Sequence, residues 1–315
     1  MGGTVTRASI PAAGPHGGDG PAVARALGLA AGEVLDLSLS LNPLAPDPRP
    51  VVARHLDALR AYPDTTEATA ALTKAMGVAA DRLLLTNGGA EAIALLAAEV
   101  GGRVDEPEFS LHPRGGGPRW RSNPHSPSGL LAGADETADV WDEAFFPLAA
   151  GRWTRGDGVP VVGSLTKLLA CPGLRAGYLL ADPDLVERCR ARQPAWSVGS
   201  LASTALPELL AAVDLPVWRD GVASLRGRLG DVLATHGLRA RPSDANWVLV
   251  EAPGLREALA PHGVVVRDCT SFGLAGVVRI AVPDEDGILR LDRALSAAGI
   301  RRTTERRVDS AERTT

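Results

Sequence analysis

Short apolar runs alternate with segments of helical periodicity along the first two thirds of the chain. Runs of buried-strand character occur at residues 82–86, 140–148 and 159–164. Helical spacing is present at residues 49–60 and 65–77, and a Gly-Gly turn leads from the first strand into another helix. Strands that alternate with helices are typical of a mainly parallel sheet covered on both faces, so we predict an α/β fold with a three-layer αβα unit.

The last third of the chain has a different pattern, in which helices are grouped before short apolar strands. This grouping predicts a smaller α+β unit at the C-terminal end. We therefore divide the chain into an N-terminal arm and helix at 1–40, a large domain at 41–195, a small domain at 196–300 and a disordered tail at 301–315.

Composition and charge narrow the class of protein. The chain has 45% hydrophobic and 22% charged residues, a net charge of −4 and no basic stripe, which argues against a nucleic-acid partner. It has no run of about 18 apolar residues and no signal-peptide pattern, so we expect a cytoplasmic protein without membrane contact. Cys171, Cys189 and Cys269 are too scattered to predict a disulfide framework or a metal site.

Lysine is scarce in this chain, since only Lys74 and Lys167 occur among 33 basic residues. Lys74 falls on a helix face that we interpret as solvated. Lys167 lies in the turn Gly163-Ser164-Leu165-Thr166-Lys167, between two predicted strands. An arginine cannot form a Schiff base, so Lys167 is the residue that we select for covalent chemistry.

The segment Gly163–Lys167, followed by Pro172-Gly173-Leu174-Arg175-Ala176-Gly177, resembles the Schiff-base lysine segment of the fold type I pyridoxal-phosphate (PLP) aminotransferase superfamily. The resemblance implies the PLP-transferase fold, with Lys167 bonded to the cofactor. Ser164 and Thr166 would donate hydroxyls to the cofactor phosphate, and Arg175 would supply its counter-charge.

Two further motifs resemble cofactor-binding parts of the same superfamily. Asp142, in Asp142-Glu143-Ala144-Phe145, corresponds to the aspartate that keeps the pyridine nitrogen protonated. The turn Gly88, Gly89 and Ala90 corresponds to the glycine turn whose backbone amides bind the phosphate. Tyr62 resembles the tyrosine that reaches the phosphate of the neighbouring subunit, which implies a homodimer.

Within the superfamily the chain looks like the cobalamin-pathway branch, which contains L-threonine O-3-phosphate decarboxylase. The resemblance runs from about His16 to Ala298 and includes His16-Gly17-Gly18-Asp19, Asn42-Pro43-Leu44 and Arg267-Asp268-Cys269-Thr270-Ser271-Phe272. It implies an amino-acid substrate, phosphorylated in this branch, with Arg279, Asn42 and His16 as substrate-binding residues. Arg279 would clamp the α-carboxylate. A transaminase resembling histidinol-phosphate aminotransferase is the alternative.

The chain also departs from the family pattern. Where relatives have Asn-Pro-Thr-Gly, the chain has Asn123-Pro124-His125-Ser126-Pro127-Ser128-Gly129, which makes Asn123 and Ser126 the candidate cofactor contacts. His112 aligns with the aromatic residue that stacks on the cofactor ring. Only ten residues lie between His112 and Asn123, and Phe145 replaces a tyrosine. These differences leave a third alternative, a non-catalytic protein with the PLP fold.

Overall fold

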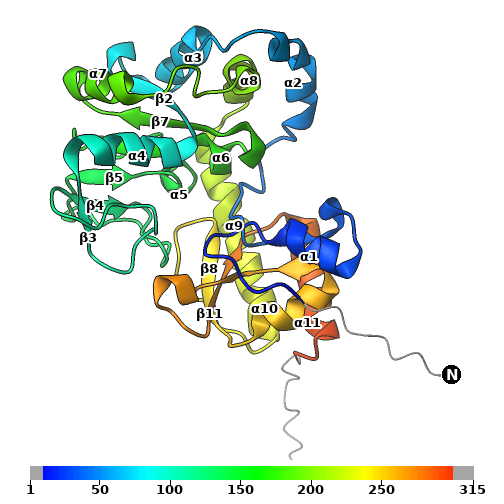
Figure 1. Ribbon diagram of the computed structural model, residues 1–315. Coiled ribbons are helices and arrows are strands. Elements are labelled where there is room, and N and C mark those ends of the chain that lie inside the picture. Colours follow the sequence, from blue (N-terminus) through cyan, green and yellow to red (C-terminus); the bar gives the residue numbers. More distant parts are fainter. Residues whose placement is uncertain (1–9, 301–315) are drawn as a thin grey trace, which may run out of the picture.

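The computed structural model describes residues 10–300, so the predicted tail at 301–315 and the first part of the N-terminal arm lie outside the described residues. The chain forms two lobes, each built on its own sheet (Figure 1). The long helix α9 (Leu215–Thr235) packs against α5 (Phe146–Ala150) in one lobe and α11 (Glu285–Ala297) in the other, and so connects them.

The larger lobe contains a six-stranded sheet in the order β2-β7-β6-β5-β4-β3. Strand β7 runs antiparallel to both of its neighbours, and the remaining pairs are parallel, which confirms the predicted mainly parallel sheet. The strands are β2 (Leu83–Asn87), β3 (Arg103–Val104), β4 (Arg119–Ser122), β5 (Val140–Asp142), β6 (Val161–Ser164) and β7 (Ala176–Leu180).

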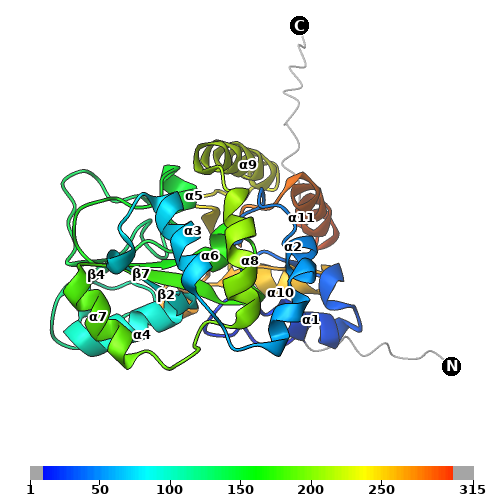
Figure 2. The ribbon, with the colours of Figure 1, turned by 90° about the horizontal axis from the view of Figure 1, so that it is seen from above.

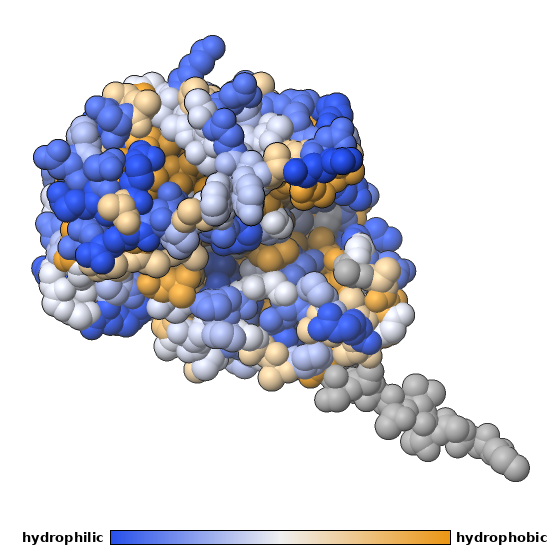
Figure 3. Space-filling model, turned by 45° about the horizontal axis from the view of Figure 1, so that its top comes forward, coloured by the Kyte–Doolittle hydropathy of each residue, from blue (hydrophilic) through white to orange (hydrophobic). Residues whose placement is uncertain are grey.

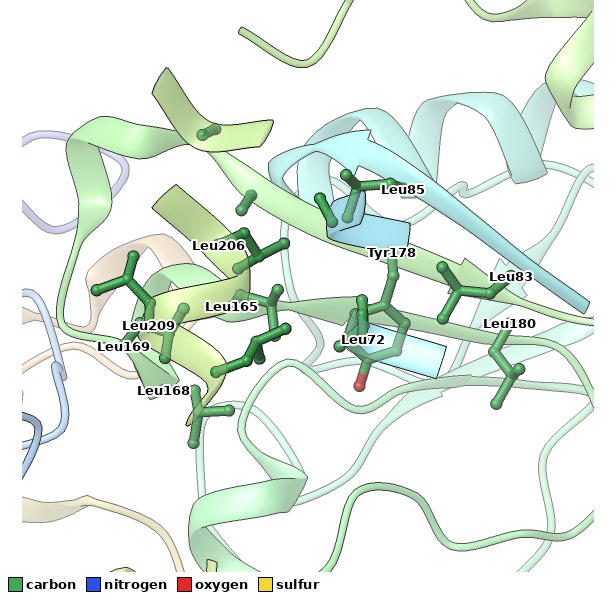
Figure 4. Packing of buried hydrophobic residues seen from close by; sticks show 14 of the residues in the cluster. Leu72, Leu83, Leu85, Leu165, Leu168, Leu169, Tyr178, Leu180, Leu206 and Leu209 are labelled. Carbon is green, nitrogen blue, oxygen red and sulfur yellow. The ribbon is translucent and has the colours of Figure 1, made fainter. Parts of the chain in front are cut away.

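Helices cover both faces of this sheet, which confirms the three-layer arrangement (Figure 2). Alternate strand residues point to opposite faces. Leu84 and Leu179 pack with α4 (Gly88–Val100) and α7 (Pro183–Arg192). On the other face, Leu83, Leu85 and Tyr178 pack with α3 (Thr66–Met76), α6 (Leu165–Leu168) and α8 (Ser200–Ala211), as Figure 4 shows.

The smaller lobe has an antiparallel sheet in the order β10-β11-β8, formed by Arg267–Asp268, Val277–Ala281 and Trp247–Glu251. Helices α9, α10 (Leu255–Leu259) and α11 pack on it, in agreement with the predicted α+β unit. The N-terminal helix α1 (Gly20–Leu27) and strand β1 (Leu35–Asp36) join this lobe, because β1 pairs with β9 (Val264–Val265).

Three boundaries differ from the sequence prediction. Residues 49–60 form two pieces, α2 (Arg49–Arg54) and a 3-10 turn at Leu56–Arg60, instead of one helix. The predicted strand at 140–148 ends at Asp142, because its carboxylate accepts a hydrogen bond from the backbone N–H of Ala144 and turns the chain into α5. Helix α8, which the boundary at residue 196 assigned to the small domain, packs against α3 in the larger lobe.

Aspartates set the starts of several helices. Asp182, Asp214 and Asp284 accept hydrogen bonds from backbone N–H groups in the first turns of α7, α9 and α11. Between residues 10 and 300, no single helix is long and apolar enough to cross a membrane. The bent pair α8 and α9 together is long and apolar enough for a membrane span, but only length and composition support this.

Candidate active site

A cavity of about 240 Å³ lies between the two lobes, where the surface is hollowed in Figure 3. Its wall combines residues that follow the large-sheet strands with residues from the smaller lobe and from the N-terminal segment. The polar and charged side chains on the wall are His16, Ser38, Ser122, Ser126, Asp142, Ser164, Thr166, Lys167, Arg175, Arg267 and Arg279. Most of the residues predicted from the sequence are therefore gathered in one place.

Lys167 lies in the short helix α6, directly after β6, and its Nζ donates a hydrogen bond to Leu39 O at 2.9 Å. Burial lowers the pKa of Lys167 from 10.5 to about 8, and the charges of Arg279 and Arg175 add to the shift. An amine with this pKa is partly neutral near pH 8 and can act as a nucleophile.

One end of the cavity is built from the turn before α4 and the turn that holds Lys167. Gly89, Ala90, Ser164 and Thr166 line this end. Gly88 has a φ of 74°, which favours glycine, and a Cβ at this position would lie 2.4 Å from Arg175 Nη2, so a larger residue would displace the guanidinium.

Arg175 itself has a φ of 54°, and its Nη1 lies 3.4 Å from Thr166 Oγ1. The left-handed conformation costs a non-glycine residue on the order of 1 kcal/mol. A helix N-terminus, two hydroxyls and a guanidinium together form a site for an anion.

At the opposite end of the cavity, Asp142 terminates β5 and is buried. Its Oδ1 accepts from the backbone of Ala144, and its Oδ2 lies 2.9 Å from His112 Nε2. His112 is buried behind Asp142 and does not line the cavity, whereas Phe109 and Phe145 do. The structure thus places the predicted ring-stacking residue behind the carboxylate, because the carboxylates of Asp142 and Glu108 pair with its imidazole.

Glu108 is buried and organises this loop, although no motif along the chain singled it out. Its Oε1 accepts from Ser122 N, and its Oε2 accepts from Ser122 Oγ and Phe109 N. Glu108 Oε2 also lies 3.5 Å from His112 Nδ1. Burial lowers the pKa of His112, but the hydrogen bond to Asp142 and the pairing with Glu108 outweigh this effect and raise it to about 9.

Ser126 and Asn123 occupy different positions relative to the cavity. Ser126 lines the cavity and is fixed by a hydrogen bond from its backbone N–H to Ser122 Oγ. Asn123 is buried outside the wall, where its Oδ1 accepts from Ala132 N. Its Nδ2 has no hydrogen-bond partner among the described residues.

Two arginines from the smaller lobe enter the cavity side by side. Arg267 on β10 and Arg279 on β11 are register partners, and both are buried. The Nε of each has no hydrogen-bond partner in the described part of the chain. Their guanidinium groups lie over aromatic rings, Phe272 for Arg267 and Trp247 for Arg279. Burial lowers the pKa of Arg279 to about 9, and the neighbouring Arg267 adds to the shift.

The remaining predicted residues divide into near and distant positions. His16 lines the cavity, and its Nδ1 lies 3.5 Å from Ser110 Oγ. Asn42 does not line the wall, because its Nδ2 donates to Leu168 O and its backbone N–H to Lys167 O, which holds the lysine turn. Tyr62 is 77% exposed and stacks on Trp196 at 4.5 Å, away from the cavity of its own chain.

Several residues of the cavity wall were not assigned from the sequence, and Arg267 and Phe109 are the two that matter most for the chemistry. Arg267 belongs to a motif that was recognised as a branch signature, but its role could not be read from it. Phe109 lies three residues before His112, and the alignment with the family pattern assigned ring stacking to His112 and not to Phe109.

The chain is similar in sequence to proteins of known name. Histidinol-phosphate aminotransferase of Halorubrum lacusprofundi is 27% identical, with 88% of this chain and 93% of that protein aligned. The adenosylcobalamin biosynthesis bifunctional protein CobDQ of Leptospira interrogans is 23% identical, with 86% of this chain and 40% of that protein aligned.

Solved structures share the fold. Histidinol-phosphate aminotransferase from Sinorhizobium meliloti, in complex with pyridoxal 5'-phosphate, has a TM-score of 0.74, 16% identity and 95% and 98% coverage of the two chains. L-threonine-O-3-phosphate decarboxylase from Porphyromonas gingivalis has a TM-score of 0.66, 21% identity and 79% and 94% coverage. The sequence pattern of the family described as "Aminotransferase class I and II" matches residues 122–295, more than half of the chain. The chain therefore belongs to the class I and II aminotransferase family of PLP-dependent enzymes.

Proposed function

We propose that this protein binds PLP in the cavity between its lobes and decarboxylates O-phospho-L-threonine in cobalamin biosynthesis. The cavity residues fit the cofactor. The cradle around Gly88, which a Cβ would fill, and the guanidinium of Arg175 suit the cofactor phosphate, together with the Gly89 and Ala90 amides and the hydroxyls of Ser164 and Thr166.

The opposite end of the cavity suits the pyridine ring. Asp142 presents a buried carboxylate, which would hold a proton on the ring nitrogen. Phe109 lines the same end, so we assign the contact with the ring face to Phe109 and not to His112. Ser126 is the nearest counterpart of the asparagine that relatives carry, and Lys167 lies between the two ends.

When bound, PLP supplies an electron sink for the bond that breaks at the substrate Cα. Lys167 would then be free to move a proton at that carbon, because its lowered pKa places it near the range in which it can both donate and accept. Asp142 would keep the sink electron-poor, and Arg279 would orient the carboxylate that leaves.

One observation favours a phosphorylated amino acid as the substrate. Arg267 and Arg279 are neighbouring buried cations whose Nε atoms lack partners in the described chain, and both face the cavity. Two such cations suit a ligand with two anionic groups. O-Phospho-L-threonine carries a carboxylate and a phosphate, whereas histidinol phosphate carries only the phosphate.

The alternative is a transaminase that resembles histidinol-phosphate aminotransferase, in line with the Halorubrum relative. The two reactions are separated by their products. The holoenzyme incubated with O-phospho-L-threonine should release CO2 and aminopropanol phosphate. Formation of pyridoxamine phosphate and a keto acid would support transamination. The absence of any turnover of either O-phospho-L-threonine or histidinol phosphate with PLP bound would support the non-catalytic alternative.

We further propose that the protein is a homodimer. Four large apolar side chains are exposed on the 3-10 turn at Leu56–Arg60, just after it, and in the loop before α8, namely Leu56, Leu59, Tyr62 and Trp196. A second copy of the chain would cover them. Tyr62 would then reach the phosphate end of the neighbouring cavity, as the family resemblance implies.

A further inference from the structure

The N-terminal residues 10–19, which we call the strap, lie across the substrate side of the cavity. His16 and Gly17 of the strap line the cavity. In Figure 1 this dark-blue segment passes in front of the smaller lobe and leads into α1. Ile10 anchors its beginning, because it packs against a cluster formed by α1 and residues of the smaller lobe.

A single buried guanidinium holds both ends of the strap. Arg256 on α10 is 1% exposed and does not line the cavity. Its Nη1 donates to Pro11 O at 2.9 Å, and its Nη2 donates to Asp19 Oδ2 at 3.2 Å. Asp19 Oδ2 also accepts a hydrogen bond from Gly14 N, so this carboxylate joins the middle of the strap to its end. A buried cation of this kind strongly favours the conformation in which its partners are in place.

The middle of the strap fits closely against the segment that follows β1. A Cβ on Gly17 would lie 2.1 Å from Ser38 O, so no other residue allows this approach. Gly18 N donates to Ser38 Oγ at 2.7 Å, and Gly20 N donates to Asp36 Oδ2 at 2.9 Å. These hydrogen bonds fix the position of His16 in the cavity wall.

The strap also touches the groups that face the substrate. Pro15 O accepts from Arg267 Nη2 at 3.3 Å. On the opposite wall, the ring of His16 lies 6.4 Å from that of Phe109. The strap therefore contacts Arg267 in the smaller lobe and Phe109 in the larger lobe.

We propose that Arg256 is a positioning residue for substrate binding, which acts by holding the strap over Arg267. The proposal rests on the proposed function for the identity of the substrate, but not for the strap itself. Arginine contacts with an anion are stronger where water is excluded, so release of the strap weakens binding of the substrate. The effect on PLP should be much smaller, because in the described chain the strap makes no hydrogen bond to Arg175, Ser164 or the start of α4, which would hold the cofactor phosphate.

The test compares two variants of the holoenzyme. Arg256→Met keeps a long buried side chain without the donors, and Glu257→Gln changes the exposed carboxylate 3.6 Å from the same guanidinium without touching the strap. In Arg256→Met, hydrogen exchange in residues 10–20 should be at least about tenfold faster than in the wild type. KM for O-phospho-L-threonine should rise about tenfold, while kcat and the Kd for PLP change less than about twofold. Glu257→Gln should match the wild type in every measurement.

Asp19→Asn provides a second variant if Arg256→Met does not fold, since it removes the charge and keeps the shape; it should show the same faster exchange and the same rise in KM. Unchanged exchange in the strap, or a parallel loss of PLP and substrate affinity, would overturn the proposal. If the wild type neither binds nor converts O-phospho-L-threonine, the proposed function fails, and the exchange measurement still decides whether Arg256 holds the strap.

Discussion

His112 Nε2 lies 2.9 Å from Asp142 Oδ2, so the carboxylate that faces the cavity is shared with a buried imidazole. Glu108 flanks the other nitrogen of the same ring. The imidazole of His112 thus lies between two carboxylates at the start of the shortened segment that leads to Asn123. A protonated His112 would compensate these two buried negative charges.

The first prediction concerns the pH dependence of stability. The pKa of His112 is raised from 6.5 to about 9, so protonated His112 stabilises the folded state. Its contribution is fully present below pH 6.5 and is lost as the pH rises through about 9. In urea unfolding experiments, the free energy of unfolding of the wild type should fall between pH 6.5 and pH 9.5. This fall should be larger than the fall of His112→Gln over the same pH range. Equal falls in the two proteins would contradict this.

A second prediction isolates Glu108. Glu108→Gln removes one of the two charges that favour the imidazolium, so the NMR titration of His112 in the cofactor-free protein should move to lower pH. Glu106→Gln is the control, because Glu106 is exposed on the same loop and pairs with Arg114. A His112 titration that is unchanged in Glu108→Gln would show that the pair at 3.5 Å has no effect.

Lys167 should carry the cofactor covalently. After reduction with borohydride, PLP should remain covalently attached to the wild type and to Lys74→Ala. Lys167→Ala is expected to lose this attachment. Because the pKa of Lys167 is lowered to about 8, the rate of attachment in the wild type should rise as the pH increases through about 8 and the amine loses its proton. Peptide mapping locates the reduced cofactor, and a label on Lys74 would refute the assignment.

Arg175 and Arg279 should fail in different ways, because they would hold different anions. Arg175→Ala should weaken PLP binding and be partly rescued by excess cofactor. Arg279→Ala should retain PLP but raise KM, since loss of one partner of a buried charge pair costs about 2–5 kcal/mol, or roughly 30- to several-thousand-fold. Titration of each variant with PLP and then with O-phospho-L-threonine makes the comparison. The reverse pattern of losses would mean that the two sites are exchanged.

The exposed apolar surface should maintain the dimer. Leu59→Ser with Trp196→Ser is expected to shift the protein toward monomer in sedimentation experiments and to weaken PLP binding, because Tyr62 of the neighbour is lost. Leu289→Ser on α11 is the control, since Leu289 is also exposed but lies outside this surface. A monomer that binds PLP at full strength would exclude a shared site.

The sequence by itself determined those features that depend on neighbours along the chain. The alternation of strands and helices predicted the layered sheet, because a short strand that is apolar on both faces is buried only when helices cover both faces of the sheet. Lys167 lies in the short helix that follows β6, and Gly88 opens α4 directly after β2, so their positions near strand ends follow from local order. Asp142 was selected because Asp142-Glu143-Ala144-Phe145 resembles the acidic motif of the family, and in the structure it ends β5.

Only the tertiary structure decided which side chains of the irregular segments face the cavity. Phe109 and His112 lie on one short loop, and their orientation depends on Glu108 binding Ser122 and on His112 binding Asp142, which is 30 residues away. Asp19 and Arg256 are separated by 237 residues, so no local pattern relates them. In a loop without repeating periodicity, long-range hydrogen bonds and buried charges fix the inward face, and these form only when distant segments of the chain meet.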